Sequence, residues 1–208
     1  LRDLPTSVLL AYWPQLAIRG PYPETLARWD TLLQQGPVYA LGGTDAHANT
    51  YRLGPLARQV FSYAHLFRTV NTHLLLAEPW RNDAVHDAQL VYEALERGRA
   101  FIAYDGLAPA RGFSFWAESR QGQHAMGEAF IAQGAVRLRA QAPARARLRL
   151  LHNGFCVAEK VGTTLEYVSR APGAYRMEAY RPYLLRQRTW ILSNPILVQT
   201  QPKRPEAG

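Results

Sequence analysis

The sequence predicts an α/β portion followed by an all-β portion, and three observations support this organisation. Helix-like and strand-like segments alternate up to about residue 105, which is typical of α/β folds with a parallel component. After Pro109 no helical pattern recurs, and short alternating runs are separated by turn residues. With 208 residues and 48% hydrophobic residues, the chain is long and apolar enough to bury a core. We therefore expect two domains, residues 1–108 and 109–198, and a disordered tail over 199–208.

The first portion contains three helix-like and three strand-like segments. Apolar side chains recur every three or four residues in the helix-like segments, and the second and third end before a glycine that can cap a helix. The strand-like segments are short apolar or β-branched runs. The expected helices cover residues 3–18, 23–35 and 83–97, and the expected strands cover residues 38–41, 69–76 and 100–104.

The second portion contains seven short runs of alternating side chains, with the size and spacing of an immunoglobulin-like β-sandwich. Asn153-Gly154 separates two of these runs and is a strong signal for a type I′ hairpin. Asn194-Pro195 interrupts the last run, because proline cannot donate a hydrogen bond inside a sheet. The seven runs cover residues 113–118, 135–141, 146–152, 155–160, 164–168, 174–181 and 189–198.

Arginine dominates the basic residues of the chain. Only Lys160 and Lys203 among the 24 basic residues are lysines, and the formal net charge is +8. Such a charge favours phosphate-bearing partners. Five arginines recur at every second residue across two expected strands, and we favour a solvated outer face over a nucleic-acid-binding strip because no aromatic side chains accompany them. The sequence therefore argues against a nucleic-acid partner. The five are Arg137, Arg139, Arg145, Arg147 and Arg149.

Several classes of protein are excluded by composition. The longest uncharged stretch, residues 4–18, contains two prolines, so we expect no transmembrane helix and no membrane partner. No signal-peptide pattern is visible, which favours a cytoplasmic location. Cys156 is the single cysteine, which excludes an intramolecular disulfide and a cysteine-rich zinc site. Because the chain starts at Leu1 and has methionine only at positions 126 and 177, we expect it to be a fragment.

The turn that follows residues 38–41 is the most informative segment of the chain. Gly42-Gly43 precedes Asp45 and His47, so a carboxylate and an imidazole two residues apart can turn toward one point at the end of a strand. Such a pair fits half of a metal site. On spacing alone, the simpler interpretation is a turn or helix cap at Asp45, with His47 as a polar loop residue.

Five segments of the chain, taken together, carry a family resemblance. They are the run from Leu4 through Leu16-Ala17-Ile18-Arg19-Gly20-Pro21, Gly42-Gly43-Thr44-Asp45-Ala46-His47, Asn71-Thr72-His73-Leu74-Leu75-Leu76, Gly98-Arg99-Ala100-Phe101-Ile102-Ala103 and Trp190-Ile191-Leu192-Ser193-Asn194-Pro195-Ile196. The chain resembles the C-terminal half of metal-dependent phosphoesterases with a polymerase and histidinol phosphatase (PHP) domain, in the subgroup that carries a β-sandwich after the barrel. The resemblance extends over nearly the whole chain.

The resemblance implies the C-terminal portion of a distorted (βα)7 PHP barrel, followed by the β-sandwich. It also implies a centre of two or three divalent metal ions (manganese, zinc or iron), where a metal-activated water hydrolyses a small phosphate ester. Asp45 and His47 match the family's last metal-binding motif. The family's first motif, a His-x-His pair, does not occur in the sequence. We therefore expect the upstream ligands to be missing and the fragment to be inactive in isolation.

Three further residues of the barrel-like portion are candidates for the site. Arg19 is a candidate contact to the substrate phosphate, from its place in barrel-like sequence. Asp105 follows an expected strand, where a barrel places residues that face its site, although it can equally begin a turn. His73 is a candidate for the same reason, although a histidine in an apolar strand is most often packed in a core.

Two hypotheses of different classes follow from the sequence. In the first, the intact protein is a phosphoesterase, which requires Asp45 and His47 to meet further ligands in one cleft. In the alternative, the chain is a non-catalytic module whose β-sandwich surface binds a partner or caps the barrel. A barrel cut partway through also exposes unpaired strand edges, so we expect a homodimer through the exposed barrel edge.

Overall fold

The structure is a computed structural model, and it describes residues 20–48, 50–53, 55–59 and 61–200. The helix expected over residues 3–18, the candidate Arg19 and most of the expected tail lie outside these ranges. None of the described helices has the length and apolar character that crossing a membrane requires.

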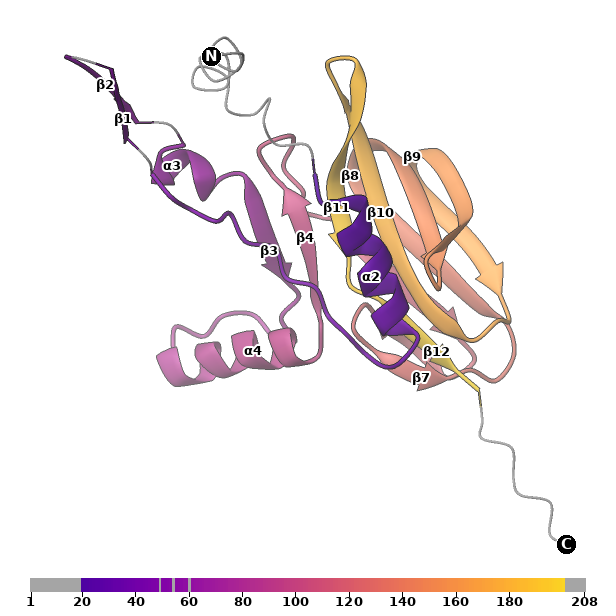
Figure 1. Ribbon diagram of the computed structural model, residues 1–208. Coiled ribbons are helices and arrows are strands. Elements are labelled where there is room, and N and C mark those ends of the chain that lie inside the picture. The colour runs from indigo at the N-terminus through magenta and orange to yellow at the C-terminus, as the bar shows by residue number, and fades with distance from the viewer. Residues whose placement is uncertain (1–19, 49, 54, 60, 201–208) are drawn as a thin grey trace, which may run out of the picture.

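Ten strands form one curled sheet (Figure 1), and its main path has the order β3-β4-β11-β10-β8-β5-β6. β9 pairs with β8, and β12 lies between β10 and β7. Among the described strands, β7 and β12 pair in parallel and the other neighbours are antiparallel. Because β4 pairs with β11, strands from before and after residue 108 belong to the same sheet. The strands are β1 (Thr50–Leu53), β2 (Leu56–Gln59), β3 (Val70–Leu74), β4 (Ala100–Tyr104), β5 (Ser114–Ser119), β6 (Gly122–Ala125), β7 (Ala129–Ile131), β8 (Val136–His152), β9 (Phe155–Ser169), β10 (Gly173–Tyr183), β11 (Arg186–Ser193) and β12 (Ile196–Gln199).

This architecture corrects the predicted fold class. The described part of the chain has three helices, α2 (Pro23–Leu33), α3 (Tyr63–Leu66) and α4 (Ala84–Glu96), beside a sheet that is almost entirely antiparallel. The prediction of a (βα)7 barrel portion is therefore wrong. The two separate sheets of the predicted immunoglobulin-like sandwich are also replaced by the single curled sheet, and β1 and β2 form a small hairpin of their own.

The helix α4 connects two antiparallel strands, which explains the first error. β3 and β4 flank α4 in the sequence and pair from Val70 opposite Tyr104 to Leu74 opposite Ala100. The chain leaves β3 through the irregular segment 75–83, and α4 brings it back to the end of β3 that it left (Figure 1). A parallel crossover requires the connection to return to the start of the first strand. The alternation of helix and strand therefore predicted the elements but not the direction of β4.

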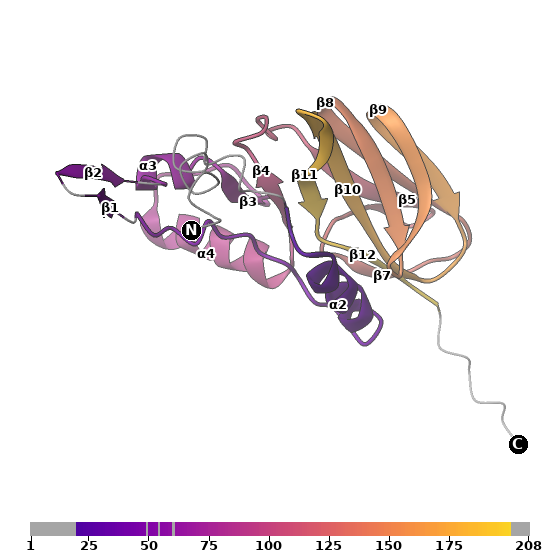
Figure 2. The same ribbon diagram turned by 45° about the horizontal axis from the view of Figure 1, so that its top comes forward.

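The long strands β8 and β9 explain why the all-β half is one sheet. Each combines two of the predicted runs into a single strand. β9 pairs with both halves of β8, whereas the other side of β8 pairs first with β5 and then with β10. The register shifts between Gln141 and Ala146, around Pro143, which lacks the N–H that a regular ladder needs. The two halves of the sheet therefore share β8 and β9, as the curl in Figure 2 shows.

The main core fills the curl of the sheet, and α2 packs on a second, smaller apolar cluster. The core combines buried side chains of β4, β5, β8, β10 and β11. Trp29 and Leu33 of α2 contact Ala174 of β10 and Leu197 of β12. Trp29 Nε1 also donates a hydrogen bond to the carbonyl of Val38, 2.8 Å away, which fixes the chain that leaves the helix. This segment leads directly to the Asp45–His47 turn.

Candidate functional site

The turn that carries Asp45 and His47 is held close to β3 and β4 at Gly42. The Gly42 N–H donates to Thr72 Oγ1 at 2.9 Å, and the Thr72 hydroxyl donates to the Gly42 carbonyl at 3.0 Å. A Cβ at Gly42 would lie 2.5 Å from Ile102 Cγ2. Close approach therefore requires glycine at position 42, whereas a Cβ at Gly43 would meet nothing within 4 Å. The segment at 38–41 lies along this face without forming the predicted strand.

Asp45 and His47 lie side by side at the surface. His47 Nδ1 is 2.9 Å from the carbonyl oxygen of Asp45 and 3.3 Å from its Oδ1. The two side chains are 68% and 93% exposed for His47 and Asp45 respectively. When Nδ1 carries the proton and donates to the carbonyl, Nε2 presents a lone pair that is free to bind a ligand. Metal-binding histidines are commonly oriented in this way through their second nitrogen.

The Asp45–His47 turn borders a depression of about 430 Å³. One part of its lining is apolar, and two threonines, Asp45 and His47 form the rest. Asp45 and Phe61 both line it and both have positive backbone φ angles, 46° and 56°. No pattern in the sequence had indicated Phe61 as a site residue. The lining residues are Thr44, Asp45, His47, Phe61, Leu66, Thr69 and Val70.

The other two described candidates, His73 and Asp105, form a separate hydrogen-bonded cluster. His73 Nε2 lies 2.8 Å from Asp105 Oδ2, which also accepts from Asn71 Nδ2 at 2.8 Å. Asp105 Oδ1 accepts from the Ala110 N–H at 2.9 Å. The His73 ring stacks on Phe101, with 4.6 Å between ring centroids. Both carboxylate oxygens of Asp105 thus hold the chain that follows β4. Asn71 takes part in this cluster, although the sequence had not indicated it as a candidate.

The two clusters lie on opposite faces of β3. Val70 lines the depression beside Asp45, whereas Asn71 and His73 contact Asp105. Successive side chains of a strand point to opposite faces. The structure therefore does not bring His73 and Asp105 to the Asp45–His47 turn. Within the described ranges, no three histidine, cysteine, aspartate or glutamate side chains lie close enough together to hold a metal ion.

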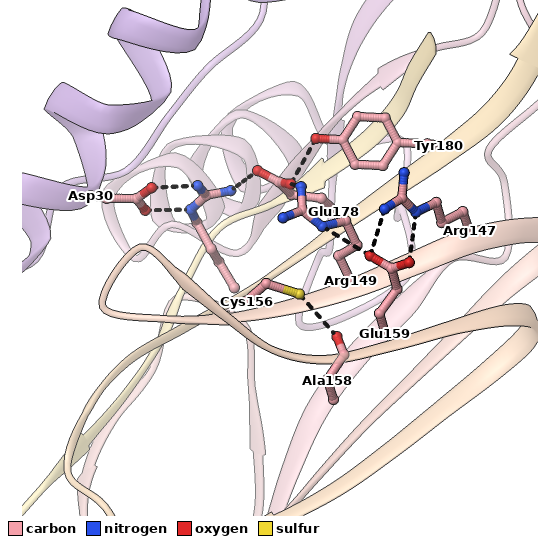
Figure 3. Close-up of polar contacts among 9 residues, drawn as sticks. Asp30, Arg147, Arg149, Cys156, Ala158, Glu159, Glu178 and Tyr180 are labelled. Atoms are coloured by element: carbon pink, nitrogen blue, oxygen red, sulfur yellow. Dashed lines mark hydrogen bonds and ion pairs between the residues drawn. The ribbon is translucent and has the colours of Figure 1, made fainter. Parts of the chain in front are cut away.

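A buried charged cluster lies between α2 and β10, and Figure 3 shows its extent. The Arg176 guanidinium donates to both carboxylate oxygens of Asp30 at 2.6 Å and to Glu178 Oε1 at 2.7 Å. It also lies over the Trp29 ring, 4.9 Å from its centroid. Burial lowers the pKa of Arg176, but the two carboxylates outweigh it and hold the pKa above its usual range. The cluster fixes α2 to the sheet, and no sequence signal had indicated it.

The cluster continues toward the surface through alternating charges (Figure 3). Glu178 Oε2 accepts from the Tyr180 hydroxyl at 2.7 Å and from Arg149 at 3.2 Å. Burial, together with the Glu178 carboxylate, raises the pKa of Tyr180 to about 12. At the surface, Arg147 donates two hydrogen bonds of 2.8 Å to Glu159 and lowers the pKa of that carboxyl. A cleft of about 600 Å³ between α2 and the sheet is lined by part of this cluster.

The arginine strip of β8 faces outward, as the alternation predicted. Glutamates of neighbouring strands pair with four of its five members: Arg137 and Arg139 with Glu166, and Arg147 and Arg149 with Glu159. Arg139 also pairs with Glu118, and Arg149 also pairs with Glu178. The side chains between them are turned inward and buried. Charge on this face is therefore largely neutralised within the sheet, which disfavours its use as an anion-binding strip. The buried residues are Val136, Leu138, Leu148 and Leu150.

Comparisons with known proteins give no match to a family model, a curated protein or a solved structure. The function of the chain is therefore inferred from its own residues. Of the described clusters, the charged cluster and the His73–Asp105 cluster use their polar groups to hold the fold. The Asp45–His47 turn leaves its groups accessible beside a depression.

Proposed function

We propose that Asp45 and His47 contribute to a divalent-metal centre that hydrolyses small phosphate esters. One observation carries this proposal: a carboxylate and an imidazole meet at 3.3 Å on an exposed turn, and the imidazole is oriented by a backbone carbonyl. The family resemblance of this turn to PHP-domain phosphoesterases supports the same reaction. The described antiparallel fold adds no support, because the barrel that the resemblance implies is not formed, and the proposal therefore rests on the turn itself.

The donor set of the turn fits a divalent metal ion. Imidazole nitrogen and carboxylate oxygen are ligands of manganese, zinc and iron. His47 would bind through Nε2, because Nδ1 faces the Asp45 carbonyl, and the Asp45 carboxylate would supply oxygen. A bound metal ion supplies a hydroxide near neutral pH and stabilises charge on the phosphate. The residues of the turn orient and hold the ion, and the depression receives the substrate.

The proposal requires further ligands, because the described residues of one chain do not gather three ligand side chains in one place. Two ligands do not complete a tetrahedral or octahedral site, and His73 and Asp105 lie on the other face of β3. We propose a second copy of the chain as one source, associated along the side of β3 that pairs with none of the described strands. Light scattering with and without zinc tests this homodimer.

Isothermal titration of the chain with Zn²⁺ and Mn²⁺ tests the centre itself. We expect Asp45→Asn and His47→Ala each to weaken binding by about tenfold or more, because each removes a direct ligand. Glu96→Gln serves as a control, since Glu96 is an exposed carboxylate on α4. Equal metal binding by the wild type and both variants would contradict the proposal. That outcome would favour the alternative, a non-catalytic module that binds a partner or caps another domain.

A further inference from the structure

We propose that the depression beside Asp45 and His47 binds an aromatic ester group of the substrate, and that Phe61 selects this group. The inference rests on the proposed phosphoesterase function and names its substrate class: phosphate esters that carry an aromatic ring. It is carried by the lining of the depression and by the backbone conformation at Phe61.

The depression has an apolar side and a polar side, which suit the organic group and the phosphate group of a phosphate ester. Phe61, Leu66 and Val70 form an apolar wall, whereas Asp45 and His47 stand at the polar side. No arginine or lysine is among the described residues that line the depression. The apolar side chains therefore contact the neutral ester group, and the phosphate lies at the side where Asp45 and His47 would hold the metal ion.

The depression is large enough to admit a single ring. About 430 Å³ lies at the lower end of the range for small-molecule sites. An aromatic side chain in the wall offers a flat apolar face, and pairs of aromatic rings attract beyond the area that they bury. A methyl ester would leave most of this wall in contact with water.

Phe61 is held in this wall at a conformational cost. Its φ of 56° is unfavourable for a bulky side chain. The chain leaves Phe61 into the cap of α3, where the Ser62 hydroxyl accepts from the His65 N–H. Two of the five described non-glycine residues with positive φ, Asp45 and Phe61, line this one depression. Strain of this kind gathers at binding and catalytic sites.

Nuclear magnetic resonance titrations with phenyl phosphate and methyl phosphate, with and without Zn²⁺, test the inference. For the wild type we expect phenyl phosphate to bind about tenfold more tightly than methyl phosphate. Phe61→Ala should remove this preference, and Phe61→Leu should reduce it while keeping an apolar side chain. Phe67→Ala is the matched control, since Phe67 is 62% exposed on the same short helix segment and does not line the depression.

The outcomes separate this inference from the proposed function. Equal binding of the two esters by the wild type, or an unchanged preference in Phe61→Ala, overturns the inference even where zinc binds. A preference that depends on Phe61 without zinc binding supports the aromatic pocket and contradicts the metal centre. Unchanged zinc affinity in Phe61→Ala is expected, because Phe61 is not a ligand, and circular dichroism verifies that each variant is folded.

Discussion

In the charged cluster beneath α2, the Asp30, Arg176 and Glu178 side chains are buried and meet one another in several hydrogen bonds. In the turn after Gly43, the Asp45 carboxylate and the His47 imidazole are exposed. Among the described residues, the polar contacts of these two side chains are between Asp45 and His47 themselves. Burial leaves no alternative to internal pairing, because an unpaired buried charge is costly. Exposure keeps ligand positions open. The first cluster thus holds the fold, and the second is free for chemistry.

The largest effect is expected from breaking the buried cluster. Asp30→Ala should lower the free energy of unfolding by about 3–5 kcal/mol, because it leaves the buried Arg176 guanidinium without its bidentate partner. Urea unfolding measures this loss. Arg28→Gln, an exposed change on the same helix, should stay within about 0.5 kcal/mol. A similar loss in both variants would mean that α2, rather than the ion pair, is responsible.

The His73–Asp105 cluster should give a smaller loss. Asp105→Ala removes the acceptor of Asn71, His73 and the Ala110 N–H, and we expect a loss of about 1–3 kcal/mol in unfolding free energy. Asp105→Asn keeps one carbonyl acceptor and should lose less. If Asp105→Ala left stability unchanged but abolished zinc binding, the assignment of this cluster to the fold would be wrong.

The buried cluster should also make stability depend on alkaline pH. Tyr180 has a pKa of about 12 in the folded chain, raised from 10.0, so the unfolded chain loses this proton first. The stabilisation is complete below pH 10 and is lost as pH rises through 12. Allowing for solvent screening, the loss is on the order of 1–2 kcal/mol. Unfolding curves should be less pH-dependent over this range for Tyr180→Phe, but not for the exposed change Tyr22→Phe.

The smallest effect on stability is expected at the proposed site. Asp45→Asn and His47→Ala should change the unfolding free energy by less than about 0.5 kcal/mol, because both side chains are exposed. Asn also tolerates the positive φ at position 45. Thermal unfolding with and without zinc sharpens the contrast: the wild type should gain more stability than either variant at the same zinc concentration, because the variants bind the metal more weakly. A large loss in the metal-free variants would place Asp45 and His47 with the structural clusters.

Local sequence patterns predicted many elements of this fold. Pro23 and the apolar spacing after it marked α2, and Asp83 caps α4 through hydrogen bonds to the Val85 and His86 N–H groups. Asn153-Gly154 forms the expected turn, with φ angles of 50° and 87°. Each of these signals depends on neighbours within a few residues, which a sequence displays directly.

The fold class was wrong because it depends on direction and pairing between distant segments. The path through residues 75–83 makes β4 antiparallel, and the segment around Pro143 is a bend inside β8 rather than a turn between strands. The same limit applies to function. Asp45 and His47 are two residues apart and could be singled out, whereas Asp30 and Arg176 are separated by 146 positions and carry no shared signal.

The central hairpin of β8 and β9 has a consequence for how the chain folds. Its residue pairs extend from His152 opposite Phe155 to Val136 opposite Ser169. The pairs can therefore form one after another, starting at the tight turn and ending at the far ends of the two strands. Contacts between near neighbours form fastest, because little chain entropy is lost in closing them. β5 and β10 then add to the same side of β8, from opposite directions along the chain. We therefore expect a folding nucleus in the hairpin of β8 and β9, with the pairing of β4 and β11 among the last steps.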